Sequence, residues 1–448
     1  MSKKELQEIF EKVKQRDPEQ TEFHQAVEEV FQDLEKILDQ DEKYIEVIRK
    51  MVEPERVISF RVPWIDKDGK QQINRGYRVQ FNSAIGPYKG GLRFHPSVTL
   101  SILKFLGFEQ TFKNALTTLP MGGGKGGSDF NPRNKTDAEV NSFCISFMTE
   151  LAKYIGSHTD IPAGDIGVGG REIGFLFGQY KRITGVYEGT LTGKGITFGG
   201  SLVRTEATGW GGVYFLQHML KANDDELKDK RVLVSGSGNV AQYAIDKLLD
   251  KKAKPLSASD SDGTIIAKDG LTRKHWKFLI ELKQEKRGRV KEMADEFDDI
   301  EYHEGKSPWE LDIEADIALP SATQNEIDKD NAKNMIDHKI KVVCELANMP
   351  TKPEAIKAFQ KADVLFGPAK AANAGGVAVS GLEMSQNRQG LSWTHEEVQE
   401  KLKEIMKDVF DACAEAAEEI GDKTNYSAGA NISGFKKVAQ AMIAQGAV

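Results

Sequence analysis

The 448-residue sequence predicts an α/β fold, and three features of the chain support this prediction. Apolar residues recur at helical spacing near both ends of the chain. Two segments in which apolar and polar residues alternate are typical of a β-hairpin. A short apolar strand, a glycine-rich turn and an amphipathic helix follow one another near residue 236. A chain of this length suffices for about two to three domains.

Helices are expected where apolar side chains recur every three or four residues. The hairpin is expected at residues 57–62 and 77–81, with Asp68-Gly69 as a typical turn sequence between them. The expected helices include residues 23–34, 136–154, 398–413 and 435–443.

Composition excludes several classes of protein. The chain has 61 lysines and arginines against 68 aspartates and glutamates, a net charge of −7, whereas a general nucleic-acid-binding protein needs a basic surplus. No apolar run approaches the roughly 18 residues of a membrane span, and the N-terminal segment does not resemble a signal peptide. Cys144, Cys344 and Cys413 lie far apart and have no zinc or redox spacing. We therefore expect a cytoplasmic protein with buried cysteines and no metal site.

Residues 236–241 carry the Gly-x-Gly-x-x-Ala variant of the dinucleotide-binding fingerprint. They follow a candidate strand at 230–235, and a second candidate strand at 255–259 runs into Asp260 about 20 residues further on. The first glycine permits a tight turn, and the second lets a pyrophosphate approach the helix N-terminus. This context predicts a Rossmann-like module that binds a dinucleotide.

Three lysines lie in or near glycine-rich segments. Lys125 lies within Gly122–Gly127, Lys89 precedes Gly90-Gly91, and Lys113 lies between these two segments. Such dense glycine normally marks a backbone that turns sharply or approaches a ligand closely. A single lysine is usually a surface residue, but the glycines around Lys89 and Lys125 favour a binding site. Three converging cations would suit a substrate with two carboxylates.

Five segments of the chain resemble the signature segments of the hexameric glutamate dehydrogenases. The similarity extends from about residue 20 to the C-terminal end, and the segments occur in the order found in the family. One departure is Trp210, where the family pattern has a tyrosine, so an aromatic side chain is retained. The five segments are 89–94, 119–127, 162–167, 204–209 and 371–377.

The resemblance implies two domains and a homohexamer. Residues 1–200 would form an N-terminal α/β domain that binds substrate and makes the oligomer contacts. Residues 425–448 would fold back onto this domain. Residues 201–424 would form the Rossmann-like dinucleotide-binding domain.

The resemblance also implies an enzyme that reversibly deaminates L-glutamate to 2-oxoglutarate and ammonium. Lys125 would be the catalytic lysine, because burial and neighbouring charges would lower the pKa of its amine. Asp165 would relay protons to and from the leaving amine. Lys89 and Ser380 would bind the side-chain carboxylate of the substrate. The expected substrate-binding residues are Lys89, Gln110, Lys113, Gly164 and Ser380.

The expected cofactor is NADP, with NAD as the alternative. Asp260 lies where an acidic residue would bind the ribose 2′-hydroxyl of NAD. The segment 259–263, together with Lys283 and residues 288–290, nevertheless resembles the NADP-dependent bacterial members of the family. The expected cofactor-binding residues are Thr208, Gly238, Asn239, Val240, Ser261, Lys283, Arg289, Asn348 and Asn373, of which Ser261, Lys283 and Arg289 would contact the 2′-phosphate.

Two other functions are less consistent with the sequence. A dehydrogenase for apolar amino acids would leave Lys89 as a buried cation facing an aliphatic side chain. A catalytically silent nucleotide-binding or scaffold protein would be expected to lack Lys125 or Asp165, and both are present. The expected partners are glutamate, 2-oxoglutarate, ammonium and further copies of the chain, with no nucleic acid and no membrane.

Overall fold

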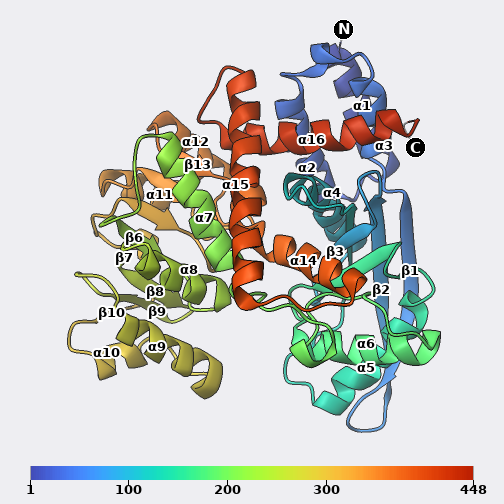
Figure 1. Ribbon diagram of the computed structural model, residues 1–448, viewed down its shortest axis with the longest axis horizontal. Helices are drawn as coiled ribbons and strands as arrows, with labels where there is room; N and C mark the ends of the chain where they lie inside the picture. Colours follow the sequence, from blue (N-terminus) through green and yellow to red (C-terminus); the bar gives the residue numbers. More distant parts are fainter. Residues whose placement is uncertain (1, 447–448) are drawn as a thin grey trace. The chain divides into compact units, whose positions relative to one another are not determined.

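The computed structural model describes residues 2–446, which pack as two compact units (Figure 1). Unit 1 contains the chain up to Arg204, residues Val377–Val398 and the chain from Asn431 onward. Unit 2 contains Thr205–Gly376 and Gln399–Ala430. The boundaries of these units differ from the expected domain boundaries chiefly at residues 377–398, which pack in unit 1.

Unit 1 contains a five-stranded sheet of β1 (Arg56–Ile65), β2 (Gln71–Asn82), β3 (Tyr88–Phe94), β4 (Gly123–Ser128) and β5 (Asp160–Gly164). The strand order is β1-β2-β4-β3-β5. β1 and β2 form the expected hairpin, in which Val57 pairs with Val79. β2 runs antiparallel to β4, whereas β3 runs parallel to both of its neighbours, β4 and β5.

Helices cover the sheet of unit 1. α4 (Leu100–Leu116) packs on β2 and β4, and α2 (Thr21–Leu34) packs on α4. α5 (Asp137–Leu151) packs on β1 and on α6 (Gly170–Thr184). The remaining helices with residues in unit 1 are α1 (Ser2–Arg16), η1 (Leu38–Gln40), α3 (Tyr44–Met51), η2 (Ile196–Phe198), and parts of α14 (Gly375–Gln389), α15 (His395–Glu419) and α16 (Tyr426–Ala444).

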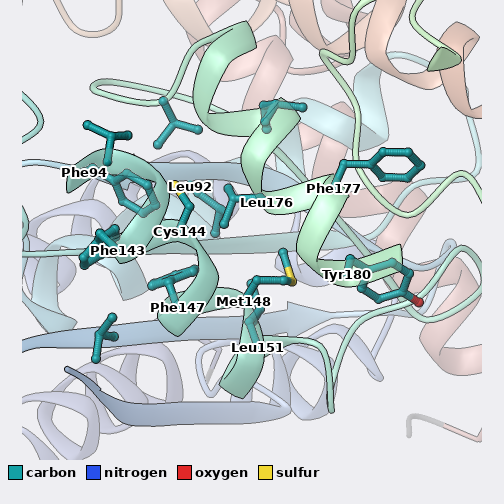
Figure 2. Packing of buried hydrophobic residues seen from close by; sticks show 14 of the residues in the cluster. Leu92, Phe94, Phe143, Cys144, Phe147, Met148, Leu151, Leu176, Phe177 and Tyr180 are labelled. Atoms are coloured by element: carbon teal, nitrogen blue, oxygen red, sulfur yellow. The ribbon is translucent and has the colours of Figure 1, made fainter. Parts of the chain in front are cut away.

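One hydrophobic core of unit 1 lies between the sheet and the helices α5 and α6 (Figure 2). α5 begins at a capping box in which Thr136 and Glu139 satisfy each other's backbone N–H groups. The rings of Phe94 and Phe143 meet edge to face with their centroids 5.0 Å apart. Burial of one such side chain stabilises the fold by about 1.5–3 kcal/mol. Cys144 is buried in the same core, as expected.

The glycine-rich residues 122–127, where the sequence predicts a sharp turn or a close approach to a ligand, lie mostly in the buried strand β4, which the sequence does not predict. Glycine is needed because neighbouring atoms approach this backbone closely. A Cβ atom at Gly123 would lie 1.9 Å from Oγ1 of Thr111, and one at Gly90 would lie 1.7 Å from the carbonyl oxygen of Gly124. The missing side chains therefore let α4 and β3 pack directly against β4.

Unit 2 contains a parallel sheet of β6 (Arg231–Val234), β7 (Lys254–Pro255), β11 (Ile317–Leu319), β12 (Val342–Cys344) and β13 (Leu365–Gly367). The strand order is β13-β12-β11-β6-β7. A second, antiparallel sheet has the order β10-β9-β8 and consists of β8 (Ser257–Asp260), β9 (Gly263–Ile266) and β10 (Glu301–Glu304).

The candidate strand at 255–259 is divided between these two sheets. The N–H group of Leu256 donates to Val232 of β6, and its carbonyl oxygen accepts from Ala267 after β9. The chain therefore leaves the parallel sheet at Leu256 and continues into the second sheet as β8. The sequence does not indicate this division.

The helices of unit 2 flank these sheets and bury a core around Trp309, Val343 and Phe359. The predicted helices at 398–413 and 435–443 lie within α15 and α16. Among residues 2–446, no helix combines the length and the apolar character needed to span a membrane. The remaining helices are α7 (Ala207–Ala222), α8 (Asn239–Asp250), α9 (Arg273–Glu281), η3 (Leu282–Lys286), α10 (Glu292–Glu296), η4 (Pro308–Glu310), α11 (Lys329–Asp337), α12 (Pro353–Lys361) and α13 (Ala369–Ala372).

Candidate active site

Lys125 and Asp165 lie close together in unit 1. Lys125 is in the middle of β4, and Asp165 directly follows β5. Because β4 and β5 flank β3 on either side, the two side chains can meet across it, and Lys125 Nζ lies 3.4 Å from Asp165 Oδ2. Arg93 of β3 completes the group, since its Nε donates to Asp165 Oδ2 at 2.7 Å.

This environment shifts the pKa values of both groups below their usual ranges. Burial lowers the pKa of the Lys125 amine, and the charge of Arg93 lowers it further, while Asp165 opposes the shift. Burial alone would raise the pKa of Asp165, but the charges of Lys125 and Arg93 outweigh it and leave that pKa lowered. A lysine with a lowered pKa can exchange protons closer to neutral pH, which suits acid–base catalysis.

Lys89 is a second buried cation of unit 1, on β3. Its Nζ donates to Thr192 Oγ1 at 2.8 Å. Burial holds the pKa of Lys89 well below its usual value, and the charge of Glu383 opposes this shift. Within the described part of the chain, Lys89 forms no ion pair with a carboxylate. A substrate carboxylate would supply the missing counter-charge.

The other predicted substrate-binding residues lie on elements that surround β3 and β4. Gln110 and Lys113 lie one turn apart on α4, and a Cβ atom at Gly90 would lie 3.2 Å from Cγ of Gln110. Gly164 is the last residue of β5, next to Asp165. Ser380 is buried on α14. A Cβ atom at the next residue, Gly381, would lie 2.5 Å from Leu119 Cδ1.

Two contacts of this site are absent from the sequence prediction. Arg93 belongs to the segment 89–94 that carries the family resemblance, but no role follows from its sequence context. Thr192 lies about a hundred residues after Lys89 in a loop without a local motif. Only the register of β3 and the fold of that loop reveal these partners.

The dinucleotide fingerprint of unit 2 forms the expected turn between β6 and α8. Gly236 has a φ of +84°, a conformation that glycine adopts readily. Gly238 caps the N-terminus of α8, and a Cβ atom there would meet no atom within 4 Å. Asn239 and Val240 form the first turn of α8. The space at Gly238 and the N-terminal N–H groups suit an approaching pyrophosphate.

Ser261, Lys283 and Arg289 gather around the turn after β8. Arg289 donates to Ser261 Oγ at 2.9 Å, and Lys283 Nζ lies 3.6 Å from Asp260 Oδ2. The other contact of Asp260 Oδ2 is the N–H group of Val290, at 2.9 Å. The Asp260 carboxylate is therefore already engaged by protein groups.

The remaining predicted cofactor residues also belong to unit 2. Thr208 is in the first turn of α7, and a Cβ atom at Gly209 would lie 2.6 Å from the carbonyl oxygen of Val240. Asn373 Nδ2 donates to Asn348 Oδ1 at 2.9 Å. Asn348 comes shortly after β12, and Asn373 follows α13, the short helix after β13. Open α/β sheets bind their ligands at the C-terminal ends of such parallel strands.

Two family models match most of the chain. A model described as glutamate/leucine/phenylalanine/valine dehydrogenase matches residues 199–446. A second, described as the dimerisation domain of the Glu/Leu/Phe/Val dehydrogenases, matches residues 54–182.

Individual proteins with similar sequences and structures share the whole length of the chain. An NADP-specific glutamate dehydrogenase of Giardia intestinalis is 56% identical over 444 residues, which cover 99% of each chain. One from Escherichia coli K12 is 56% identical over 445 residues, again 99% of each chain. The crystal structure of Plasmodium falciparum glutamate dehydrogenase has a TM-score of 0.97 and 51% sequence identity, and covers 99% of this chain and 95% of its own.

Proposed function

Because this chain belongs to the glutamate/leucine/phenylalanine/valine dehydrogenase family, we propose that it reversibly deaminates L-glutamate to 2-oxoglutarate and ammonium with NADP(H). The observation that carries this proposal is the arrangement of the buried cations in unit 1. Lys125 has a carboxylate partner in Asp165, whereas Lys89 has a hydroxyl partner in Thr192. One lysine is thus equipped for proton transfer and the other for binding an anion.

The substrate is a dicarboxylic amino acid. Lys89 is buried and donates to a hydroxyl rather than to a carboxylate, which favours a substrate that brings its own side-chain carboxylate. Ser380 would donate a hydrogen bond to this carboxylate, and Gln110 and Lys113 would bind the α-carboxylate. The carbonyl oxygen of Gly164 would accept a hydrogen bond from the α-amino group. A leucine or valine side chain would leave Lys89 buried without a carboxylate in direct contact, which disfavours an apolar amino acid.

Lys125 and Asp165 carry out the proton transfers. The neutral Lys125 amine would remove a proton from water as the water adds to the substrate imine. The Asp165 carboxylate would accept a proton from the amino group and return it to the departing ammonia. Because the pKa values of both groups are lowered, a neutral Lys125 amine and an ionised Asp165 carboxylate can occur at the same pH.

The residues of unit 2 fit a dinucleotide. The glycine turn leaves open space at Gly238, and α8 begins there with its N–H groups directed out of the helix. Thr208, Asn239, Val240, Asn348 and Asn373 would bind the cofactor along the same edge of the sheet. When bound, the nicotinamide ring accepts or donates the hydride of the reaction.

NADP is the proposed cofactor rather than NAD. Lys283, Arg289 and Ser261 lie around the turn after β8 and would provide two cations and a hydroxyl for a 2′-phosphate. Asp260 would favour the free ribose hydroxyl of NAD, but its carboxylate is occupied by Lys283 and the N–H group of Val290. The contacts of Asp260 therefore support NADP.

We further propose that the chain acts as a homohexamer in the cytoplasm. The match of residues 54–182 to a dimerisation domain supports self-association. The number of six copies comes from the resemblance to the hexameric glutamate dehydrogenases.

The proposed function is tested by following the absorbance of the reduced cofactor. Purified chain is mixed with 2-oxoglutarate and ammonium, and NADPH and NADH are compared in parallel. We expect rapid oxidation of NADPH that depends on ammonium, and a higher kcat/KM for NADPH than for NADH. Turnover of apolar 2-oxo acids in place of 2-oxoglutarate would contradict the substrate, and a preference for NADH would contradict the cofactor.

A further inference from the structure

Glu383 is a fully buried carboxylate of unit 1 that has no part in the proposed proton transfers. It lies on α14, one turn after Ser380. Its Oε2 accepts from the N–H group of Gly193 at 2.8 Å, and its Oε1 accepts from Nζ of Lys194 at 2.8 Å. Oε1 also accepts from the N–H group of Lys194 at 3.4 Å. One carboxylate therefore holds two consecutive residues of a distant loop.

The face of α14 that carries Glu383 holds the rest of this loop, residues 190–201. Gln386 donates to Ser201 Oγ at 2.8 Å, and Asn387 donates to the carbonyl oxygen of Gly199 at 2.7 Å. Lys194 Nζ, held by Glu383, also donates to the carbonyl oxygen of Leu191. Because residues i, i+3 and i+4 of a helix share one face, these side chains form a single row of contacts.

Thr192 connects this loop to the proposed substrate site. It lies between Leu191 and Gly193, both of which take part in the contacts around Glu383. Its hydroxyl accepts the hydrogen bond from Lys89 Nζ at 2.8 Å. The position of the Lys89 amine thus depends on a loop residue whose neighbours are fixed by Glu383.

Glu383 also acts on Lys89 through its charge. The charged groups that shift the pKa of Lys89 most are Glu383, Arg78 of β2, Arg204 and Asp160 of β5. Burial lowers the pKa of Lys89 most, Arg78 and Arg204 lower it further, and Glu383 and Asp160 raise it. Asp160 forms an ion pair with Arg78, whose Nε donates to Asp160 Oδ2 at 2.9 Å. Glu383 therefore helps to keep Lys89 protonated, which is the state that binds a carboxylate.

We propose that Glu383 is a positioning residue for the side-chain carboxylate of the substrate, acting through the loop 190–201, Thr192 and Lys89. This inference rests on the proposed function. It extends that function, because it assigns selectivity for a dicarboxylate to a residue that does not touch the substrate.

The experiment compares the purified full-length chain with its Glu383→Gln variant, which keeps the side-chain shape and removes the charge. We expect the KM for 2-oxoglutarate to rise about tenfold, as for the loss of a hydrogen bond to a charged group, and the KM for ammonium to stay within about twofold. Binding of 2-oxoglutarate requires protonated Lys89 and is lost as pH rises through its pKa. Since Glu383 raises that pKa, the alkaline limb of kcat/KM for 2-oxoglutarate should move to lower pH in the variant.

Two further variants make the result decisive. Glu139→Gln removes another buried carboxylate of unit 1, at the start of α5, and should leave both KM values unchanged. Glu383→Asp keeps the charge but shortens the reach, so it should raise the KM for 2-oxoglutarate several-fold without moving the alkaline limb. If Glu383→Gln does not fold, the KM of the Glu383→Asp variant for 2-oxoglutarate tests the proposal instead.

The outcomes separate this inference from the proposed function. If the unaltered chain is active and the Glu383 variants keep its KM values and its alkaline limb of kcat/KM, only the inference is overturned. Equal increases in the KM values for 2-oxoglutarate and ammonium would also overturn it, because they would indicate a general disturbance. Inactivity of the unaltered chain with 2-oxoglutarate, ammonium and either cofactor would overturn both.

Discussion

Lys125 is buried next to one carboxylate and one guanidinium group, and its surroundings lower the pKa of its amine. If the amine activates water, its removal should affect the chemistry and not the cofactor. We expect Lys125→Ala to reduce kcat by about 10²–10⁴-fold, the usual contribution of a positioned acid–base group. The Kd for NADPH, measured by fluorescence titration, should stay unchanged. A large loss of NADPH binding would instead make Lys125 a cofactor residue.

The pH dependence of glutamate oxidation tests the same environment. The reaction requires neutral Lys125, so kcat/KM should fall as pH drops through the pKa of this lysine. Arg93 lowers that pKa, and its replacement by glutamine should therefore move the acid limb of kcat/KM to higher pH. Profiles of kcat/KM against pH for the two proteins give the comparison. A shift to lower pH would mean that a different group controls the acid limb.

At the scale of elements, the contact between β3 and β4 depends on glycines rather than on apolar side chains. A Cβ atom at Gly90 would lie 1.7 Å from the carbonyl oxygen of Gly124, and the backbone on both sides belongs to the sheet. We expect Gly90→Ala to destabilise unit 1 by about 3 kcal/mol or more, as in a severely overpacked core. The melting temperature of the variant measures the effect.

Gly178 provides a matched control for this substitution. It lies inside α6, and a Cβ atom there would meet nothing within 4 Å. Because alanine favours helix more than glycine does, Gly178→Ala should stabilise the protein by about 0.5–1 kcal/mol. Similar melting temperatures for Gly90→Ala and Gly178→Ala would mean that the sheet can move apart at Gly90 without cost.

For the whole molecule, the sequence predicts best what depends on neighbours along the chain. The helix expected at about 136–154 and the turn at Gly236 follow from local periodicity and spacing, and the structure has α5 (Asp137–Leu151) and this turn. The strand at Gly123–Ser128 does not follow from the local sequence, because it depends on how closely α4 and β3 approach the backbone of this segment. The same holds for Arg93 and Thr192, whose partners are set by strand order and by a distant loop. Family resemblance supplies the roles of Lys125 and Asp165, and the fold supplies their contact.

Self-association is expected of the whole chain, and β1 and β2 offer a surface for it. Val62 and Trp64 of β1 face the core of unit 1, whereas Val57, Ile65 and Ile73 are exposed. β1 is an edge strand, and exposed apolar side chains beside such an edge are suited to pairing with a second copy.

We therefore expect the chain to sediment at a multiple of its mass of 49.7 kDa, with six copies as the proposed number. Ile73 is 63% exposed, so Ile73→Lys should fold normally but introduce a charge into the contact. Loss of one buried isoleucine costs about 1.5–3 kcal/mol, enough to raise the dissociation constant at least tenfold. Sedimentation equilibrium over a range of concentrations would reveal smaller species. Ile183→Lys, on α6, is the control, and an unchanged mass for Ile73→Lys at every concentration would place the interface elsewhere.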